Sequence, residues 1–367
     1  MASRIQVFTP GPTALHPTIA AETAAALEDG ILSESHRSPR FVREVERTVE
    51  ALKGLLGISP EHRVLFVSSA TEAMERLVAG ATRTRTFHLV NGAFARRFRD
   101  VAENLGRDAE VLEVRDGEGF SAGVQVPEGT ELFALTQNET STGVRIPADR
   151  VHALADAAER AGALSAVDLV TGWPTEEIDP GRIDAGFFSV QKAFGLPAGL
   201  GVIVVGPVLM ERARRLEAEG ARGGGYLHLP ALLSAADRNQ TVATPNMLAI
   251  RLLGRVAEAY LDVGIQRLRQ EASAKAKLMW EAVGETGVLR SFVRDPEIRS
   301  RTVLVVERED GGSTDAIRGA LRAAGFVVGN GYGPWKGRHL RIANFPVHSV
   351  EAMAALAAAL ETAVDHG

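Results

Sequence analysis

Between residues 64 and 205 the chain alternates short apolar runs with amphipathic segments, and this alternation constrains the fold more than any other feature. Segments of helical periodicity, such as residues 73–80 and 148–161, separate most of the runs. Strands separated by helices are typical of βαβ units and of a mostly parallel sheet covered by helices. The pattern therefore predicts an α/β fold with a seven-stranded sheet, whose strands we expect at residues 64–67, 88–90, 109–114, 131–136, 163–167, 184–190 and 201–205.

The parts of the chain outside this region predict further elements. Residues 1–15 contain prolines on both sides of Gly11 and are expected to form an extended N-terminal segment. Residues 219–245 are glycine-rich and polar and predict a long functional loop. We expect helices at about 17–27, 39–56, 245–283 and 350–364, and strands near 302–306, 325–328 and 338–343. These patterns divide the chain into an N-terminal segment (1–15), a large domain (16–245) and a smaller C-terminal α+β domain (246–367).

Composition and charge narrow the class of protein. A formal net charge of −5 argues against a nonspecific binder of nucleic acid or of acidic membranes. No run of about 18 uncharged apolar residues is present, so no membrane span is expected. The first residues lack the apolar core of a signal peptide, so we expect a cytoplasmic location. Because the chain has no cysteine, disulfides, thiolate metal sites and a cysteine nucleophile are excluded. We expect no metal among the site residues.

Lys192 is the first candidate for a catalytic residue. It follows the apolar run 184–190 and precedes the glycine-rich turn 195–199, so it is expected at the end of a strand. Desolvation at such a place lowers the pKa of a lysine and frees a neutral amine that can attack a carbonyl as a Schiff-base nucleophile. A lysine at a strand end can equally extend its charge into water. The other lysines, in polar or loop-like contexts, are Lys53, Lys275, Lys277 and Lys336.

Asp168 ends the expected strand 163–167 and is a second candidate. A buried carboxylate needs a cationic partner, and a protonated pyridine nitrogen would serve. Pyridoxal phosphate pairs a lysine Schiff base with such an aspartate. An aspartate at a strand end can also simply cap the next helix. Because the carboxyl ends of parallel strands meet at one edge, we expect one crevice to hold Thr71, Phe94, residues 138–140, Asp168 and Lys192.

Three further features have both a functional and a plain structural interpretation. The turn at residues 68–72 offers hydroxyls and N–H groups to an anion at a helix N-terminus, although serine and threonine also cap helices. Phe94 could stack on a ring or pack in the core. His36 and Arg37 lie in an expected loop, either solvated or in contact with an anion. Neither a P-loop nor a G-x-G-x-x-G motif at the start of a helix is present, which disfavours the nucleotide sites of these two motifs.

Five motifs, in matching order along nearly the whole chain, resemble those of phosphoserine aminotransferases, class V pyridoxal-phosphate enzymes. They are residues 35–37 (SHR), 138–143 (NETSTG), 191–195 (QKAFG), 239–245 (NQTVATP) and 337–346 (GRHLRIANFP). The resemblance implies the fold of aspartate aminotransferases, pyridoxal 5′-phosphate as cofactor and amino-acid and 2-oxo-acid substrates. It also implies a homodimer with shared active sites.

The resemblance further implies roles for individual residues. Lys192 would hold the cofactor and move a proton between the substrate α-carbon and cofactor C4′, and Asp168 would pair with the ring nitrogen. The other implied cofactor contacts are Phe94 and Thr140 at the ring, Ala70, Thr71 and Gln191 at the phosphate, and Ala243 and Thr244 at the phosphate from the other subunit. The implied substrate contacts are Gly11, Arg341 at the α-carboxylate, and His36, Arg37, Arg338 and His339 at a distal phosphate.

Departures from the family pattern affect the phosphate contacts. Pro10 stands where the family has serine, Thr71 where one branch has arginine, and Ala243 where asparagine is usual. The spacing from Arg338 to Arg341 is also shorter than in the longer-looped branch. These changes leave the implied cofactor chemistry intact.

The leading interpretation is transamination of L-phosphoserine and 2-oxoglutarate with 3-phosphohydroxypyruvate and L-glutamate in serine biosynthesis. One alternative is a class V aminotransferase for small unphosphorylated substrates, such as alanine or serine with glyoxylate. Another is a non-catalytic α/β binding protein in which Lys192 is structural. A cysteine desulfurase is excluded because the chain has no cysteine to carry the persulfide.

Overall fold

A computed structural model describes residues 5–221, 223 and 225–365. Its larger sheet has seven strands in the order β2-β10-β9-β8-β5-β3-β4. All of them are parallel to one another except β10, which runs antiparallel to both β9 and β2. The prediction of a mostly parallel seven-stranded sheet is therefore confirmed. The strands are β2 (Arg63–Val67), β3 (Arg85–Val90), β4 (Asp108–Glu113), β5 (Leu132–Thr136), β8 (Leu164–Asp168), β9 (Ala185–Ser189) and β10 (Gly201–Val205).

Helices cover both faces of this sheet because successive side chains of a strand point to opposite faces. In β10, Val202 and Val204 pack in one core cluster, whereas Ile203 and Val205 pack in another. The first cluster includes residues of α2 (Pro39–Leu56), α5 (Ala148–Arg160) and α8 (Met247–Val263). The second includes residues of α3 (Ala70–Ala81), α4 (Ala93–Asn104), α6 (Pro207–Ala218) and α7 (Leu229–Ala236).

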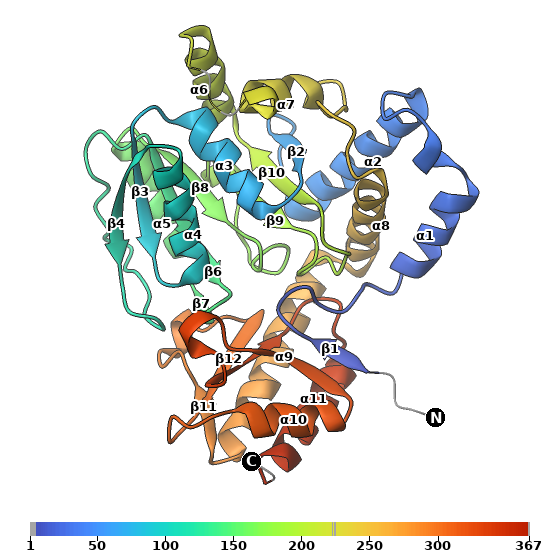
Figure 1. Cartoon of the computed structure of the whole chain (residues 1–367), viewed down its shortest axis with the longest axis vertical. Coiled ribbons are helices and arrows are strands. Elements are labelled where there is room, and N and C mark those ends of the chain that lie inside the picture. The colour runs from blue at the N-terminus through green and yellow to red at the C-terminus, as the bar shows by residue number, and fades with distance from the viewer. Residues whose placement is uncertain (1–4, 222, 224, 366–367) are drawn as a thin grey trace.

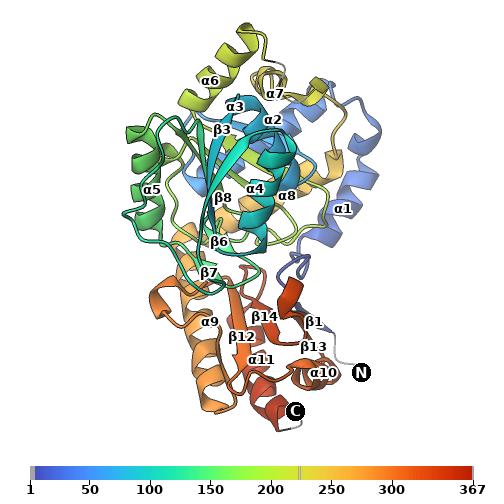
Figure 2. The same cartoon turned by 60° about the vertical axis from the view of Figure 1, so that its left-hand side comes forward.

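A second sheet lies below the first in Figure 1, with the order β1-β13-β14-β12-β11. Figure 2 shows the short hairpin β6–β7 at the junction between the two sheets. The strands of the second sheet and the hairpin are β1 (Gln6–Phe8), β11 (Leu289–Ser291), β12 (Val303–Arg308), β13 (Phe326–Asn330), β14 (His339–Ala343), β6 (Asn138–Glu139) and β7 (Val144–Arg145). The remaining helices are α1 (Ile19–Glu28), α9 (Ile265–Glu285), α10 (Asp315–Ala323) and α11 (Val350–Val364), with short 3₁₀ turns at Ile31–Ser33, Pro180–Arg182, Gly225–Leu227, Pro296–Ile298 and Gly333–Trp335.

Three predicted segments differ from the structure. The helix expected over 245–283 is two helices, because Gly264, at φ 89°, separates α8 from α9. Part of the loop expected over 219–245 is the helix α7, whose apolar residues pack against the large sheet. The extended N-terminal segment contributes β1, which pairs in parallel with β13. Arg222 and Gly224 of that loop, residues 1–4 and residues 366–367 lie outside the described part. The division into three domains stays a prediction.

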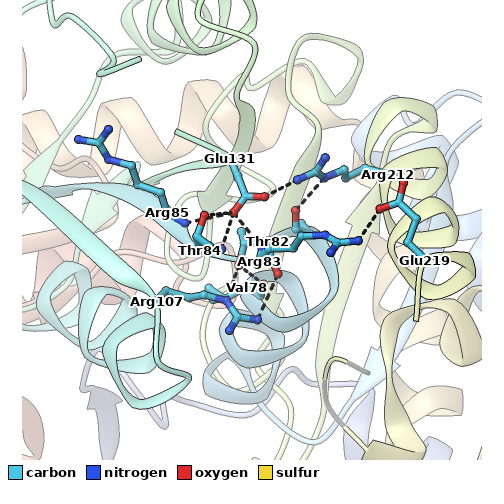
Figure 3. A network of polar contacts seen from close by, with 10 residues as sticks. Val78, Thr82, Arg83, Thr84, Arg85, Arg107, Glu131, Arg212 and Glu219 are labelled. Carbon is cyan, nitrogen blue, oxygen red and sulfur yellow. Dashed lines mark hydrogen bonds and ion pairs between the residues drawn. The ribbon is translucent and has the colours of Figure 1, made fainter. Parts of the chain in front are cut away.

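A polar network fastens the edge of the large sheet where β3 and β5 begin (Figure 3). Glu131 accepts hydrogen bonds from the backbone N–H groups of Arg83, Thr84 and Arg85 at 2.8, 2.6 and 3.1 Å. Its other carboxylate oxygen pairs with Arg212 of α6. The network ties together three elements at the edge opposite the carboxyl ends of the parallel strands. None of the helices in the described part is both long and apolar enough to cross a membrane.

Candidate active site

The N-terminal segment passes beside Lys192 at the carboxyl edge of the large sheet. The Lys192 Nζ donates a hydrogen bond of 2.9 Å to the carbonyl oxygen of Pro10. The backbone N–H of Thr13 donates to the carbonyl oxygen of Gln191 at 3.2 Å. Gly11 has a φ of 144°, and a Cβ at this position would lie 2.2 Å from the Lys192 Nζ. The close approach of lysine and backbone therefore requires glycine at this position.

The surroundings of Lys192 favour its neutral amine. Burial lowers the pKa of Lys192 to about 8, and the guanidinium of Arg341 acts in the same direction, whereas Asp168 opposes it. At pH 7 about one tenth of such an amine is neutral, far more than for an ordinary lysine. The side chain is half-buried and bonded to a backbone oxygen instead of extending into water. The site therefore holds a nucleophilic amine at neutral pH.

Asp168 ends β8 and is 4% exposed. One carboxylate oxygen accepts a hydrogen bond of 2.9 Å from the N–H of Val170. Burial raises the pKa of Asp168 to about 7, and the buried carboxyl of Glu139 adds to the rise. A cation placed beside this carboxyl would be strongly stabilised, since a buried carboxylate is costly without one.

The hairpin β6–β7 brings Asn138 and Thr140 into the same region. The Thr140 hydroxyl lies 3.1 Å from that of Thr171, and the Asn138 amide nitrogen donates to Thr171 at 2.7 Å. The Asn138 Oδ1 is buried without a hydrogen-bond partner. The carbonyl oxygen of Thr140 accepts a bond of 3.2 Å from Arg341 of β14. The hairpin thus links the carboxyl edge of the large sheet to the second sheet.

Phe94, in the first turn of α4, lies in a group of aromatic and cationic side chains. The Lys192 Nζ is 5.8 Å from the centroid of its ring, and the guanidinium carbon of Arg97 is 5.0 Å from it. The ring of Tyr332 is tilted against Phe94 with centroids 5.1 Å apart. The Arg341 guanidinium carbon lies 5.5 Å from the centre of the Tyr332 ring. The structure therefore places Phe94 beside Lys192, and Tyr332 connects Phe94 to Arg341.

The turn before α3 forms the helix N-terminus that the sequence predicts. Ser69 caps it by accepting from the N–H of Glu72 at 3.1 Å. The N–H of Ala70 donates to the Ser189 hydroxyl, at the end of β9, at 2.9 Å. Thr71 is exposed in the first turn. The Gln191 Oε1 is buried and has no hydrogen-bond partner among the described residues, so this side chain is free to turn toward a ligand.

His36, Arg37 and Thr244 form a second group. The His36 Nδ1 lies 3.2 Å from the Thr244 hydroxyl, and Arg37 donates to the Gln240 side chain at 3.0 Å. Thr244 and the adjacent Ala243 are exposed. The structure brings these predicted residues to one another, and their contacts join the loop at 240–244 instead of the group around Lys192.

Arg338 and His339, at the start of β14, have different surroundings from those of Arg341. Arg338 is exposed and donates to the carbonyl oxygen of Gly311 at 3.4 Å. His339 is fully buried, and its ring stacks on Trp335 with centroids 4.5 Å apart. Burial lowers the pKa of His339 to about 4, so it is neutral at pH 7. Their predicted contact with a distal phosphate stays a prediction.

The sequence did not point to Arg97 or Tyr332, and it assigned no role to Glu139, which lies within the predicted range 138–140. The carboxylate of Glu139 is fully buried and accepts from the N–H groups of Phe94 and Ala95 at 3.0 and 2.9 Å, which fixes the start of α4. The position of Arg97 had a signal, because a residue three positions after Phe94 shares its helix face. Tyr332 had none, since its place depends on how the turn after β13 meets α4.

Comparison with known proteins identifies relatives over nearly the whole chain. The family model Aminotransferase class-V matches residues 8–333. The chain is similar to a solved phosphoserine aminotransferase of Cytophaga hutchinsonii, with 37% identity and a TM-score of 0.94 over 98% of each chain. It also resembles a phosphoserine aminotransferase of Nocardioides sp., at 24% identity over 98% of this chain and 95% of the relative.

A further solved structure concerns the fold alone. An aspartate aminotransferase of subgroup IV from Thermus thermophilus has 24% identity and a TM-score of 0.85, over 98% of this chain and 99% of its own. The predicted aspartate aminotransferase-like fold is therefore confirmed.

Proposed function

Because the chain belongs to the aminotransferase class-V family and is a pyridoxal-phosphate-dependent aminotransferase, we propose that it interconverts L-phosphoserine and 2-oxoglutarate with 3-phosphohydroxypyruvate and L-glutamate, in serine biosynthesis. The similarity to the phosphoserine aminotransferase of Cytophaga hutchinsonii supports the substrate, and the observation in the structure that carries the transamination is Arg341. Its guanidinium is half-buried beside Lys192, and no Asp or Glu in the described part lies within 4.0 Å of it. A planar guanidinium so placed suits a carboxylate bidentately.

The residues present fit pyridoxal phosphate. Lys192 supplies an amine with a pKa of about 8, and Asp168 a buried carboxyl that a pyridinium would stabilise. Phe94 offers a ring face beside the amine, at 5.8 Å from its nitrogen. Gln191 carries an amide whose N–H groups can donate to a phosphate. In the proposal, the cofactor is held by Lys192, Asp168, Phe94, Thr140, Gln191, Ala70 and Thr71, with Ala243 and Thr244 from a second subunit.

Each of these residues has a task that follows from its chemistry. The bound cofactor supplies an electron-accepting ring that stabilises negative charge at the substrate α-carbon. Lys192, released as a free amine, takes the proton from that carbon and returns one during transfer. Asp168 keeps the ring nitrogen protonated, since burial leaves the carboxylate without water to solvate it. Arg341 orients the substrate through its α-carboxylate, with Gly11 leaving room beside the amine.

The position of the second group supports a homodimer with shared sites. His36 contacts Thr244, Arg37 contacts Gln240 of the same loop, and Thr244 and Ala243 are exposed rather than packed around Lys192. An exposed hydroxyl and a histidine with one buried, unpartnered ring nitrogen are groups that a partner's ligand could satisfy. We propose that Ala243 and Thr244 complete the cofactor-phosphate site of the partner, and that His36, Arg37 and Arg338 face the distal phosphate of the substrate. His339 is fully buried and neutral at pH 7, so it is not placed to bind that phosphate. A cytoplasmic location stays a prediction.

The deciding experiment follows the amino-group transfer from single donors to the cofactor, by absorption, in the absence of an acceptor. Phosphoserine and glutamate are expected to convert the bound cofactor at micromolar to low millimolar concentrations, and serine only at far higher ones. Conversion by alanine or serine but not by phosphoserine would replace this proposal with the unphosphorylated alternative. Protein that remains colourless with added cofactor would contradict both.

A further inference from the structure

Arg97 is a positively charged residue of the site that is not needed to hold the cofactor or the α-carboxylate of the substrate. It lies one turn after Phe94 on α4, and its guanidinium carbon is 5.0 Å from the Phe94 ring centroid. The Lys192 Nζ is 5.8 Å from the same centroid. Arg97 also contributes to the electrostatic field at both Lys192 and Asp168. It therefore faces the reacting centre from within the same subunit.

The neighbouring arginines of α4 are neutralised, whereas Arg97 is not. Arg96 pairs with Glu113 at 2.6 Å, and Arg99 pairs with Asp100 at 2.7 Å. For Arg97, no Asp or Glu among the described residues comes within 4.0 Å, and its hydrogen bond goes to the neutral hydroxyl of Tyr332. A half-buried guanidinium without a carboxylate is costly unless a ligand supplies the anion.

Tyr332 connects this cation to Arg341. Its hydroxyl accepts a hydrogen bond of 3.0 Å from Arg97, and its ring lies 5.5 Å from the Arg341 guanidinium carbon. Two guanidinium groups without carboxylate partners are therefore separated by a single aromatic side chain. Such a pair suits a small molecule with an acidic group at each end better than one with a single acidic group.

We infer that Arg97, held in place by Tyr332, is a further cation that binds the distal acidic group of the substrate, in addition to the groups proposed at the phosphate, while Arg341 binds its α-carboxylate. The inference rests on the proposed function, whose substrates all carry a distal carboxylate or phosphate. Both groups present oxygens that a guanidinium binds bidentately, so they share the recognising chemistry. Arg97 is then a specificity-determining residue supplied in the same subunit as Lys192.

The test measures binding of three unreactive ligands to the cofactor-loaded protein: succinate, 3-phosphonopropionate and propionate. Binding is followed by calorimetry and by the shift of the cofactor absorption band. The native protein is expected to bind the two dianions roughly 10- to 100-fold more tightly than propionate, because each gains a charge-assisted contact. R97Q should reduce that preference by about tenfold and leave propionate binding unchanged. Y332F should weaken the dianions by about 3- to 10-fold.

R96Q is the matched control, because it removes an arginine from the same helix that already has a surface carboxylate. It should leave all three affinities unchanged. A loss confined to succinate or to 3-phosphonopropionate would support the inference and identify which distal group Arg97 binds. An unchanged dianion preference in R97Q, or an equal loss of all three ligands, would overturn it.

The proposed function is tested separately by conversion of the bound cofactor with phosphoserine. If the native protein does not react with phosphoserine, the proposed substrate is refuted. If R97Q nevertheless lacks the dianion preference of the native protein, the role of Arg97 stands. Reaction with phosphoserine at the same KM in native protein and R97Q would overturn the role of Arg97 alone.

Discussion

A Cβ on Gly11 would lie 2.2 Å from the Nζ of Lys192, and the same Nζ donates a hydrogen bond of 2.9 Å to the preceding residue, Pro10. The N-terminal segment therefore limits the volume in which the lysine can move. Because β1 of that segment also pairs with β13 of the second sheet, both sheets fix the position of the amine. The local geometry of Lys192 is thus set by a segment more than 180 residues away in sequence.

G11A is expected to reduce cofactor binding at least about tenfold. The added methyl group would occupy the place of the Lys192 amine, and alanine is also strained at a φ of 144°. G30A is the control, because Gly30 also has a positive φ, of 73°, but nothing lies within 4 Å of an added Cβ. Titration with pyridoxal phosphate, followed by visible absorption, measures the effect. Equal affinities in the two variants would show that the clash is absent.

The rate at which cofactor-free protein attaches pyridoxal phosphate should depend on pH with a midpoint near 8. Only the neutral amine attacks the aldehyde, and burial lowers the pKa of Lys192 to about 8. The rate should therefore fall about tenfold per pH unit below 8 and level off above it. Stopped-flow absorption measures it, with K192A as the variant that should show no band. A rate still rising at pH 10 would indicate an ordinary lysine.

Elements with clear end signals could be predicted from the sequence. Helix α2 was predicted with the bounds that the structure shows, because Ser38 caps its start, Pro39 occupies its first turn and Gly57 ends it with a φ of 67°. Strand β1 was not predicted, since three residues are too few to show a periodicity. Its place in the second sheet depends on a pairing with β13 that no local pattern specifies.

Some residues of the site could be predicted from the sequence, and others could not. Lys192 and Asp168 could be predicted because the carboxyl ends of parallel strands must meet at one edge. The contact of Arg97 with Tyr332 could not, because it joins a helix of the large sheet to a turn 235 residues later in the chain. The burial of His339 between aromatic rings could not be predicted from the sequence either, because it depends on contacts with Trp335 and Phe292, which lie in separate segments.

D168N should weaken binding of pyridoxamine 5′-phosphate, which cannot attach to Lys192, by roughly 30-fold or more. Removing one member of a buried charge pair costs about 2–5 kcal/mol. Burial raises the pKa of Asp168 to about 7 in the free protein, so binding below pH 7 must first remove a proton. Affinity in the native protein should therefore fall as the pH drops below 7, and D168N should lose this dependence. Fluorescence titration of native protein and D168N with pyridoxamine 5′-phosphate, between pH 5.5 and 8.5, measures both affinities and their pH dependence.

E131Q should lower the stability of the large sheet without changing the cofactor absorption. Glu131 accepts three backbone hydrogen bonds and pairs with Arg212, at the edge of the sheet away from Lys192 (Figure 3). Hydrogen bonds to a charged group contribute about 1.5–3 kcal/mol, so the urea midpoint should fall measurably. E128Q, which changes a nearby exposed glutamate, is the matched control.

The loss of stability in E131Q should be smaller at low pH than at pH 7. Burial alone would raise the pKa of Glu131, but the N–H groups of residues 83–85 and Arg212 together lower it below its usual value. A carboxyl whose pKa is lowered by folding stabilises the protein above its unfolded pKa, near 4.3, and loses that contribution as the pH falls through its folded pKa. The stability difference between native protein and E131Q should therefore be full at pH 7 and shrink below about pH 4. A difference that stays constant from pH 7 to pH 3.5 would mean that the charge of Glu131 is not what fastens β3 and β5.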